Sequence, residues 1–454
     1  MSDARTEPIV PVTGRGDELR RLMRLAGPVM IAYLGTISMG TIDTMMAGRL
    51  GPAALGSVAL GHTWGIAVAI VAYGAARVLD PIVAQAYGAG DVRAAGLGLS
   101  RGLAMMTLLG VPVIALYATA RWGLTLLGQP EELVPAAGRY CLMLIPGMPA
   151  ILAFVVVRNF LQAIGIVRTA AYAILLANVA NVLGNGVFMY GWLGFPPLGA
   201  VGSAVSTSIA QWLMLGTLWL FSRRTIAPYW PGWKGAFAWE PLRPMLRLGL
   251  ILGLQFGVEV WAFHAAGFMM GRLGAVTFAA HAVAINLATV SFMLPSGVGV
   301  AAATRVGNLV GAGFPWGRSA AIAIGLGAGI VMLPALAFVV AARPLATIYT
   351  KDPAVVAVAA AIIPLAGAFQ LFDGTQAVAF GVLRGAGDVK IPAIVNVLGY
   401  WLFGLPIGWV LAFSVGTGAR GVWDGLVLGL AAVAVLLVIR VGRLSRRPVA
   451  RLLE

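Results

Sequence analysis

The chain alternates between long apolar stretches and short polar segments. Each apolar stretch is about 20 residues or longer, the length that an α-helix needs to cross the hydrocarbon core of a bilayer. The pattern predicts an all-α integral membrane protein with twelve transmembrane helices. With boundaries good to a few residues, these helices are 25–47, 55–78, 97–120, 134–157, 169–191, 199–221, 246–270, 278–302, 317–342, 353–377, 391–414 and 420–441.

A short phrase recurs at a fixed distance and indicates that the chain is duplicated. Gly48-Arg49-Leu50-Gly51 returns as Gly271-Arg272-Leu273-Gly274, and Gly88-Ala89-Gly90 returns as Gly311-Ala312-Gly313, in both cases 223 positions later. Further along each half, a third correspondence has a spacing of 222 positions. Parallel repeats of helical bundles are a recurring architecture of secondary transporters, whose binding site lies between the halves. Transport is therefore the leading hypothesis.

The repeat and the charge distribution together predict the domains and the topology. We expect two six-helix halves, 1–232 with a cytoplasmic tail and part of a central linker, and 233–454 with a basic cytoplasmic tail. If the N-terminus is inside, 24 of the 31 Lys and Arg residues fall on cytoplasmic segments, a strong positive-inside bias. The net charge of +15 therefore belongs to the inner membrane face, and nucleic acid is not the expected partner.

Three acidic residues lie inside apolar helices, namely Asp43, Glu259 and Asp373. An ionisable side chain at a helix centre costs about 2.5 kcal/mol or more in a bilayer, so each is a candidate functional group. The structural alternative is that each acid reaches an interface or bonds a neighbouring helix. Polar neighbours one turn away strengthen the functional interpretation: Gln255 precedes Glu259, and Gln370 and Gln376 flank Asp373.

The repeat distinguishes these acids from residues that support the fold. Asp43 shifted by 223 positions reaches Ala266, and Glu259 shifted back reaches Thr36, so each carboxylate belongs to one half only. In the fifth helix, Asn181 and Asn185 share related faces with a third asparagine, Asn178. Three asparagines over two turns indicate either a polar cavity lining or packing hydrogen bonds.

Enzyme chemistry has little support in the sequence. The three histidines, His62, His264 and His281, lie on different predicted helices without a paired metal-ligand spacing, and there is no Walker motif. We therefore expect neither an enzyme nor a bound cofactor, and an ion gradient must supply the energy. The single cysteine, Cys141, excludes an intramolecular disulfide.

Several motifs, taken in order, resemble one transporter family over nearly the whole chain. They are Asp43-Thr44-Met45-Met46-Ala47-Gly48-Arg49-Leu50-Gly51, Pro81-Ile82-Val83-Ala84-Gln85 with Gly88-Ala89-Gly90, Asn181-Val182-Leu183-Gly184-Asn185, Ala280-His281-Ala282-Val283-Ala284, Phe372-Asp373 with Gln376, and Tyr400-Trp401 with Gly404-Leu405-Pro406. This order and spacing resemble the multidrug and toxic compound extrusion (MATE) family, most closely its NorM-like bacterial branch.

The resemblance implies a cation antiporter that exports cationic, amphipathic drugs or metabolites. We expect it to act as a monomer in the bacterial inner membrane. The resemblance also implies that Asp43, Glu259 and Asp373 are the functional carboxylates and that Asn181 and Asn185 line the cavity. A lipid-linked oligosaccharide flippase of a related superfamily is the alternative. Such a flippase is expected to line its cavity with cationic residues, whereas the intramembrane charges here are acidic.

Antiport requires that the driving ion and the cargo compete for one set of groups during alternating access. A carboxylate in a low-dielectric cavity either takes up a proton or stays ionised and holds Na⁺ with neighbouring oxygens. Glu259 and Asp373 would be the Na⁺ ligands. The branch often has a tyrosine four residues before the tenth-helix acid, where this chain has Phe369. Without that oxygen, the sequence favours H⁺ slightly over Na⁺.

Overall fold

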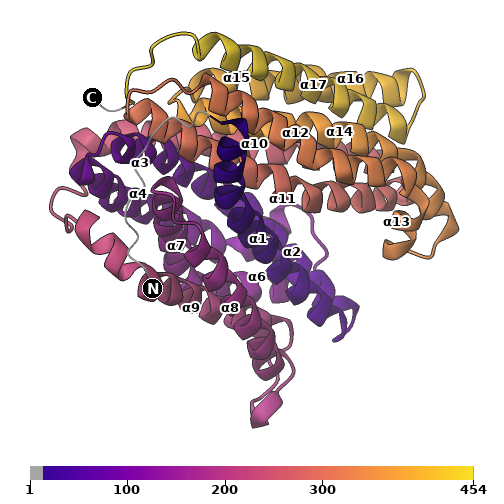
Figure 1. Cartoon of the computed structure of the whole chain (residues 1–454). Coiled ribbons are helices and arrows are strands. Elements are labelled where there is room, and N and C mark those ends of the chain that lie inside the picture. Colours follow the sequence, from indigo (N-terminus) through magenta and orange to yellow (C-terminus); the bar gives the residue numbers. More distant parts are fainter. Residues whose placement is uncertain (1–13, 453–454) are drawn as a thin grey trace. The chain divides into compact units, whose positions relative to one another are not determined.

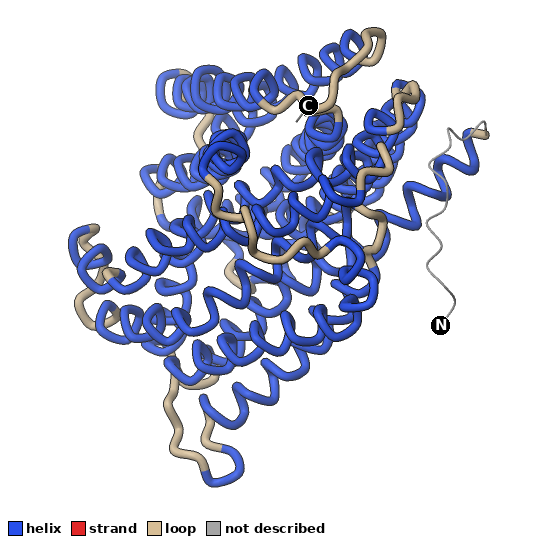
Figure 2. The backbone as a smooth tube through the Cα atoms, turned by 90° about the vertical axis from the view of Figure 1, so that its left-hand side faces the viewer, coloured by secondary structure: helices blue, strands red, loops and turns tan. Residues whose placement is uncertain are grey.

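The computed structural model describes residues 14–452, and these residues form helices joined by loops, with no strand among them (Figure 2). Twelve helical spans within this range are long and apolar enough to cross a membrane, which confirms the predicted fold class. The elements are α1 (Arg15–Gly48), α2 (Pro52–Ala75), η1 (Ala76–Val78), α3 (Leu79–Gly88), α4 (Val92–Ala118), α5 (Ala120–Leu126), α6 (Val134–Leu144), η2 (Ile145–Gly147), α7 (Met148–Ala163), α8 (Arg168–Gly184), η3 (Asn185–Met189), η4 (Trp192–Gly194), α9 (Ala200–Ile226), η5 (Ala227–Tyr229), α10 (Trp239–Arg272), α11 (Ala275–Gly311), α12 (Gly317–Val340), α13 (Ala342–Tyr349), α14 (Pro353–Gly385), α15 (Lys390–Val397), η6 (Leu398–Gly404), α16 (Leu405–Trp409), η7 (Val410–Ser414) and α17 (Ala419–Leu444).

Several helices are longer than their apolar stretches. Helix α1 begins at Arg15 instead of residue 25, and α11 ends at Gly311 instead of residue 302. The additional turns carry charged residues such as Glu18 and Arg305, which a hydropathy pattern excludes from a span. Backbone hydrogen bonding continues the helix after the apolar stretch has ended. The hydropathy pattern therefore predicts the positions of the membrane spans more accurately than the positions of the helix ends.

The repeated glycines mark turns that need a left-handed backbone. Gly51 and Gly274, each just before a helix, have φ of 110° and 115°. Gly90 and Gly313, each just after a helix, have φ of 74° and 75°. Glycine adopts positive φ without the steric cost that other residues have. The duplicated phrases therefore encode the same turns in both halves of the chain.

The described residues pack into two compact units. Unit 1 comprises Ile31–Leu79 and Asp91–Gly253, and unit 2 comprises residues 14–30, Asp80–Gly90 and residues 254–452. Helices α1 and α10 each contribute to both units. Packing defines these two units, whereas the sequence repeat defines the halves 1–232 and 233–454. The division of the chain into these halves stays a prediction.

Close helix contacts build the interior of unit 2. Helices α11, α12, α14 and α17 run beside one another (Figure 1). A methyl group on Gly381 or Gly385 of α14 would overlap the backbone oxygen of Gly299 or Ala303 in α11. Small residues that let helix backbones approach closely are a main source of packing energy in membranes. The abundance of glycine thus reflects tight helix packing in this unit.

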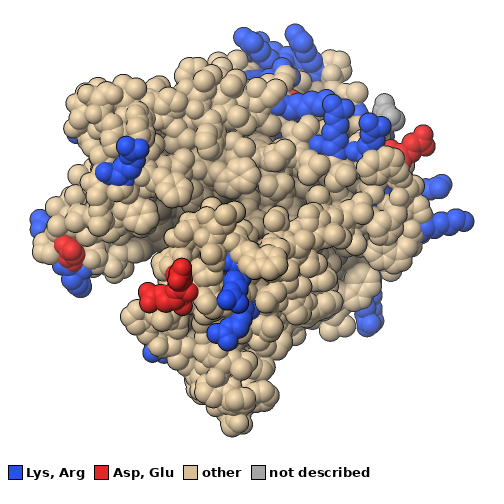
Figure 3. Space-filling model, turned by 180° about the vertical axis from the view of Figure 1, so that it is seen from behind, with Lys and Arg blue, Asp and Glu red and all other residues tan. Residues whose placement is uncertain are grey.

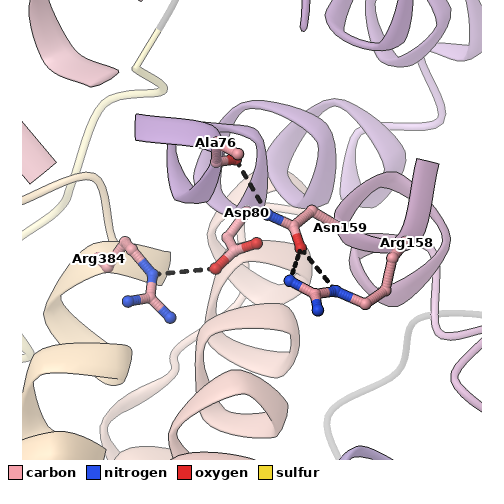
Figure 4. A network of polar contacts seen from close by, with 5 residues as sticks. All are labelled: Ala76, Asp80, Arg158, Asn159 and Arg384. Atoms are coloured by element: carbon pink, nitrogen blue, oxygen red, sulfur yellow. Dashed lines mark hydrogen bonds and ion pairs between the residues drawn. The ribbon is translucent and has the colours of Figure 1, made fainter. Parts of the chain in front are cut away.

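Buried ion pairs also hold unit 2 together. The Arg305 guanidinium donates Nε and Nη2 to the two carboxylate oxygens of Glu18 at 2.8 and 2.9 Å, with both side chains buried. Arg384 on α14 pairs with Asp80 of α3 at 3.0 Å (Figure 4). Asp80 and Arg384 are far apart in the sequence, and no sequence pattern predicts that they pair.

The end of the chain lies against the same unit. Arg451 donates Nη2 to the Gly311 oxygen at 2.9 Å, and the Leu452 amide donates to Oε1 of Gln85 at 2.8 Å. Nε2 of Gln85 donates in turn to the Gly385 oxygen at 3.0 Å. The last described residues therefore connect the ends of α3, α11 and α14.

Charged residues are sparse on the surface that Figure 3 displays, where most side chains are neither Lys, Arg, Asp nor Glu. Large exposed apolar side chains are numerous, including Leu333 and Leu336 of α12 at 76% and 61% exposure. In water such exposure would favour aggregation, whereas lipid chains solvate it well. The surface thus agrees with a membrane location.

Candidate functional site

All nine residues proposed from the sequence for the site are buried. They are Asp43, Asn181 and Asn185 in unit 1, and Gln255, Glu259, Phe369, Gln370, Asp373 and Gln376 in unit 2. The two groups are described separately.

Neutral donors surround Asp43 in unit 1. Oδ1 of Asp43 accepts a hydrogen bond from Nδ2 of Asn185 at 2.6 Å, and Oδ2 accepts one from the Thr207 hydroxyl at 2.8 Å. Asn181 donates Nδ2 to the same hydroxyl oxygen at 3.1 Å, which orients the hydroxyl proton toward Asp43. The donors come from η3 and α9, while Asp43 lies in α1. Donors of this kind stabilise the ionised carboxylate.

The helix that carries these asparagines changes its hydrogen-bond pattern at the site. Asn185 is the first residue of η3, a π-helical segment, and single π segments within α-helices are frequent at functional sites. Tyr190, at the end of η3, donates its hydroxyl to the Met46 oxygen of α1 at 2.7 Å. Asn178 instead donates to the Gly35 oxygen at 3.0 Å. Asn178 therefore connects two helices, and Asn181 and Asn185 belong to the carboxylate network.

In unit 2, two amide groups hold one oxygen of Glu259. Gln255, one turn earlier on α10, donates Nε2 to Oε2 of Glu259 at 2.9 Å. Asn396 of α15 donates Nδ2 to the same oxygen at 3.0 Å. The sequence singled out Gln255 but not Asn396, because a lone asparagine on a distant helix carries no spacing signal.

Asp373 is buried in α14 and lies within electrostatic range of Glu259. It has no ion-pair partner among the described residues, and its Oδ1 accepts no hydrogen bond from them. The flanking glutamines differ from each other in their contacts. Gln370 donates Nε2 to the Ala288 oxygen of α11 at 2.8 Å. Oε1 of both Gln370 and Gln376 is buried and has no hydrogen-bond partner within residues 14–452.

Aromatic rings connect the helices around these acids. Phe263, one turn after Glu259, contacts Phe369 edge-on with centroids 5.7 Å apart, and contacts Tyr400 at 5.5 Å. Phe369 in turn contacts Trp423 of α17 at 5.8 Å. Such edge-to-face pairs add about 0.5–1.5 kcal/mol each beyond their burial. Phe369 thus has a packing role, and Tyr400 of η6 packs against the same Phe263 ring.

Both repeats place an asparagine against a carboxylate on equivalent helices. Asp43 of the first span accepts from Asn185 of the fifth, and Glu259 of the seventh span accepts from Asn396 of the eleventh. Asp43 shifted by the repeat of 223 reaches Ala266, seven residues after Glu259. Seven residues are about two helical turns, so both acids occupy the same helix face. Both repeats therefore contain the asparagine–carboxylate pair, but the pair lies at different positions along the helices.

The acids and their neighbours also decide which ions the site suits. Within residues 14–452 there is no group of three or more His, Cys, Asp or Glu side chains that could hold a metal ion. The pair Glu259 and Asp373 offers two carboxylates among neutral oxygens, a donor set for hard cations of low charge or for protons. The residues therefore fit the predicted coupling ions, H⁺ or Na⁺.

Comparisons with known proteins give the family. The model of the MatE family matches the chain twice, over residues 28–187 and 252–410, in agreement with the internal repeat. A probable multidrug resistance protein NorM of Burkholderia pseudomallei is 36% identical over 436 residues, covering 93% of this chain and 92% of that protein. The multidrug resistance protein PmpM of Pseudomonas aeruginosa is 32% identical and covers 95% and 92%.

Solved structures agree with the sequence comparisons. The crystal structure of the eukaryotic MATE transporter AtDTX14 superposes with a TM-score of 0.86 at 23% identity, covering 95% of this chain and 99% of the other. These findings confirm the predicted fold and the prediction of a transporter, not an enzyme. The twelve spans and the bacterial relatives identify a multi-pass inner-membrane protein. With both halves matched and identity above 30% over nearly its whole length, the chain belongs to the MatE family of membrane transporters.

Proposed function

We propose that this transporter is a cation-coupled antiporter that exports cationic, amphipathic drugs or metabolites. The printed names of the relatives, multidrug resistance protein NorM and PmpM, support the cargo class. The observation that carries the proposal is the burial of Asp43, Glu259 and Asp373 within apolar helices. Buried carboxylates attract a cationic cargo and repel an anionic one, which speaks against a carrier of pyrophosphate-linked sugars.

Coupling follows from competition for these carboxylates. A bound H⁺ or Na⁺ neutralises a carboxylate and removes the charge that holds a cationic drug, so ion entry releases the drug outward. Loading of the drug from the cytoplasm requires the opposite exchange. The transporter alternates its access between the two sides of the membrane. It therefore exports the drug against the drug gradient while the ion enters down the ion gradient.

The proposal includes the orientation and the oligomeric state. Both termini and the segment between α9 and α10 lie in the cytoplasm, and the Lys and Arg bias supports this orientation. The protein works as a monomer, since each chain carries both repeats and all three acids. Reporter fusions after Ser222 and after the last residue test the orientation, because a periplasmic signal from either would contradict it.

Transport in reconstituted vesicles tests the function. Wild-type protein should move a cationic dye such as ethidium under an imposed H⁺ or Na⁺ gradient, applied one at a time. Asp373→Asn and Glu259→Gln should each abolish ion-driven exchange, because neither amide can neutralise or release a charge. Asp352→Asn is the matched control, since Asp352 caps α14 through the Ala354 amide and lies outside the site.

Two results would contradict the proposal. Exchange by Asp373→Asn and Glu259→Gln at wild-type rates would remove the site assignment. Unchanged susceptibility of an efflux-deficient bacterium to every cationic drug upon expression, together with a cell-envelope defect upon deletion, would favour the flippase.

A further inference from the structure

The segment that follows α17, residues 445–452, is anchored at its start to unit 2. In Figure 1 it is the yellow loop that leads to the end marked C. Just before it, Arg440 donates Nε to Oδ2 of Asp388 at 2.8 Å, which connects α17 to the turn between α14 and α15. Ser445 lies against the first residue of α12, because a methyl group on Gly317 would be 3.1 Å from Cβ of Ser445. The segment therefore starts from a fixed position.

Two contacts with the second repeat hold the other end of the segment. Arg451 donates Nη2 to the Gly311 oxygen at the end of α11, at 2.9 Å. The Leu452 side chain lies against Gly387, where a methyl group would be 2.7 Å from Cδ1 of Leu452. Gly387 has a φ of 88°, so glycine is favoured at this turn, and it leaves room for the leucine. Residues 445–452 are thus attached to the second repeat at both ends.

One further bond connects the segment to the first repeat. The Leu452 amide donates to Oε1 of Gln85 on α3 at 2.8 Å, and Nε2 of Gln85 donates to the Gly385 oxygen of α14 at 3.0 Å. The Gln85 side chain is buried, and both the oxygen and the nitrogen of its amide group are used in these bonds. Loss of either partner leaves a buried polar atom with fewer hydrogen bonds, which is costly. Gln85 is therefore a polar link between α3 and two parts of the second repeat.

Small residues bring α3 and α11 together beside this link. A methyl group on Gly307 would be 2.7 Å from Cβ of Ala84, which is fully buried, and one on Gly311 would overlap the backbone oxygen of Gln85. Ala84 and Gly307 are 223 positions apart, so the contact joins equivalent residues of the two repeats. Transporters built from repeats open by moving one repeat against the other. Opening at this end must therefore separate α3 from α11 and α14, which breaks both bonds of the Gln85 side chain.

We propose that residues 445–452 are a strap that stabilises the closed state of the cytoplasmic end of unit 2, through the hydrogen bond from the Leu452 amide to Gln85. The inference rests on the proposed function, which supplies the alternating access and the cytoplasmic orientation. The strap contacts the second repeat through Ser445, Arg451 and the Leu452 side chain, so it stays on that repeat and releases Gln85 when this end opens. One hydrogen bond contributes a small net free energy. The strap therefore lowers the population of the open state without preventing opening.

The test measures how often the contact between α3 and α11 opens. The reporter protein is the full chain with Ala84→Cys and Cys141→Ser, and its labelling by a water-soluble maleimide is followed in nanodiscs without drug. Leu452→Pro removes the amide donor and should raise the labelling rate about fivefold. Arg451→Gln removes the anchor on α11 and should raise the rate about threefold. The matched control is Arg446→Gln, which removes the same charge from an exposed arginine of the strap and should leave the rate unchanged.

Labelling of the native Cys141 distinguishes opening of this contact from general loosening of the fold, because Cys141 is buried in unit 1. In chains that keep Ala84 and Cys141, the labelling rate should be the same with and without Leu452→Pro. Equal labelling of the reporter protein with and without Leu452→Pro would overturn the inference, and so would an equal rise in the labelling of both cysteines. Labelling requires neither drug nor an ion gradient. Unchanged labelling in a protein that exports dye therefore refutes the strap alone, whereas a wild type that exports no cationic dye under either gradient contradicts the proposed function.

Discussion

Gly88 and Gly311 occupy reciprocal positions in unit 2. A methyl group on Gly88 would overlap the backbone oxygen of Asn308, and one on Gly311 would overlap the backbone oxygen of Gln85. Gln85 and Asn308 are separated by 223 positions, as are the two glycines. The ends of α3 and α11 therefore contact each other through equivalent residues of the two repeats. The glycine of the duplicated phrase allows this close contact in both directions.

Alanine at Gly311 should destabilise the protein by at least the 1–3 kcal/mol or so typical of overpacked sites, because its methyl group meets a backbone atom that cannot rotate away. Gly88→Ala should have a similar effect. Gly329→Ala on α12 is the control, since a methyl group there meets no atom within 4 Å. The apparent melting temperature in detergent measures the difference, and equal melting temperatures for the three variants would refute the reciprocal contact.

Breaking the buried ion pair in unit 2 should be costly. Glu18→Gln leaves the Arg305 guanidinium without its bidentate partner, and removal of one partner of a buried pair costs about 3–5 kcal/mol. The control lies one residue away on α1: Asp17 pairs with Arg20 at 3.4 Å with exposed side chains, so Asp17→Asn should cost about 0–1 kcal/mol. Thermal unfolding of both variants decides this, and a Glu18→Gln protein as stable as Asp17→Asn would contradict it.

The donors around Asp43 should matter only while Asp43 carries a carboxylate. Thr207→Val keeps the side-chain shape and removes a hydrogen bond to Oδ2, which should cost about 1.5–3 kcal/mol. The same substitution in an Asp43→Asn background should cost less, because a hydrogen bond to a neutral amide is weaker. A double-mutant cycle on melting temperature measures the coupling, and additive effects would exclude it.

Gln255 and Asn396 should compensate for each other. Both donate to Oε2 of Glu259, so Gln255→Leu or Asn396→Leu alone removes one of these two donors. We expect each single variant to retain reduced ion-driven efflux and the double variant to lose it. Thr289→Val, which removes only a hydrogen bond to the Ile285 oxygen of its own helix, is the control for a polar substitution. A double variant with the activity of the single variants would show that these amides do not orient Glu259.

Much of this architecture can be predicted from the sequence, because apolar length and glycine spacing are local signals. The twelve spans and the duplication follow from stretches such as 55–78 and from the repeated phrase at Gly48 and Gly271. The buried acids can also be found locally, since Asp43, Glu259 and Asp373 interrupt apolar runs. The chemical character of these positions could therefore be predicted without knowing which residues contact each other.

The hydrogen-bond partners of the acids could not be predicted from the sequence in the same way. Thr207 and Asn396 lie 164 and 137 residues from the carboxylates that they bond, and isolated threonine and asparagine residues carry no distinguishing spacing. Tyr400 was noted only as part of a motif, because its ring contact with Phe263 arises from packing between distant helices. Asp80 illustrates the same limit, since its Arg384 partner comes from a helix about 300 residues later.

Unit 2 combines segments that are far apart in the sequence, and this affects how the protein is made. Its α1 turns at residues 14–30 and its α3 are synthesised long before Arg451 and Leu452, which bond Gly311 and Gln85. Unit 1 ends at Gly253 and has all its residues when little more than half of the chain has been translated. The first helical turns must therefore wait in the membrane, with Glu18 unpaired to Arg305, until the remaining spans have been inserted. Insertion chaperones that shield polar groups of nascent membrane proteins are expected to act on this interval of synthesis.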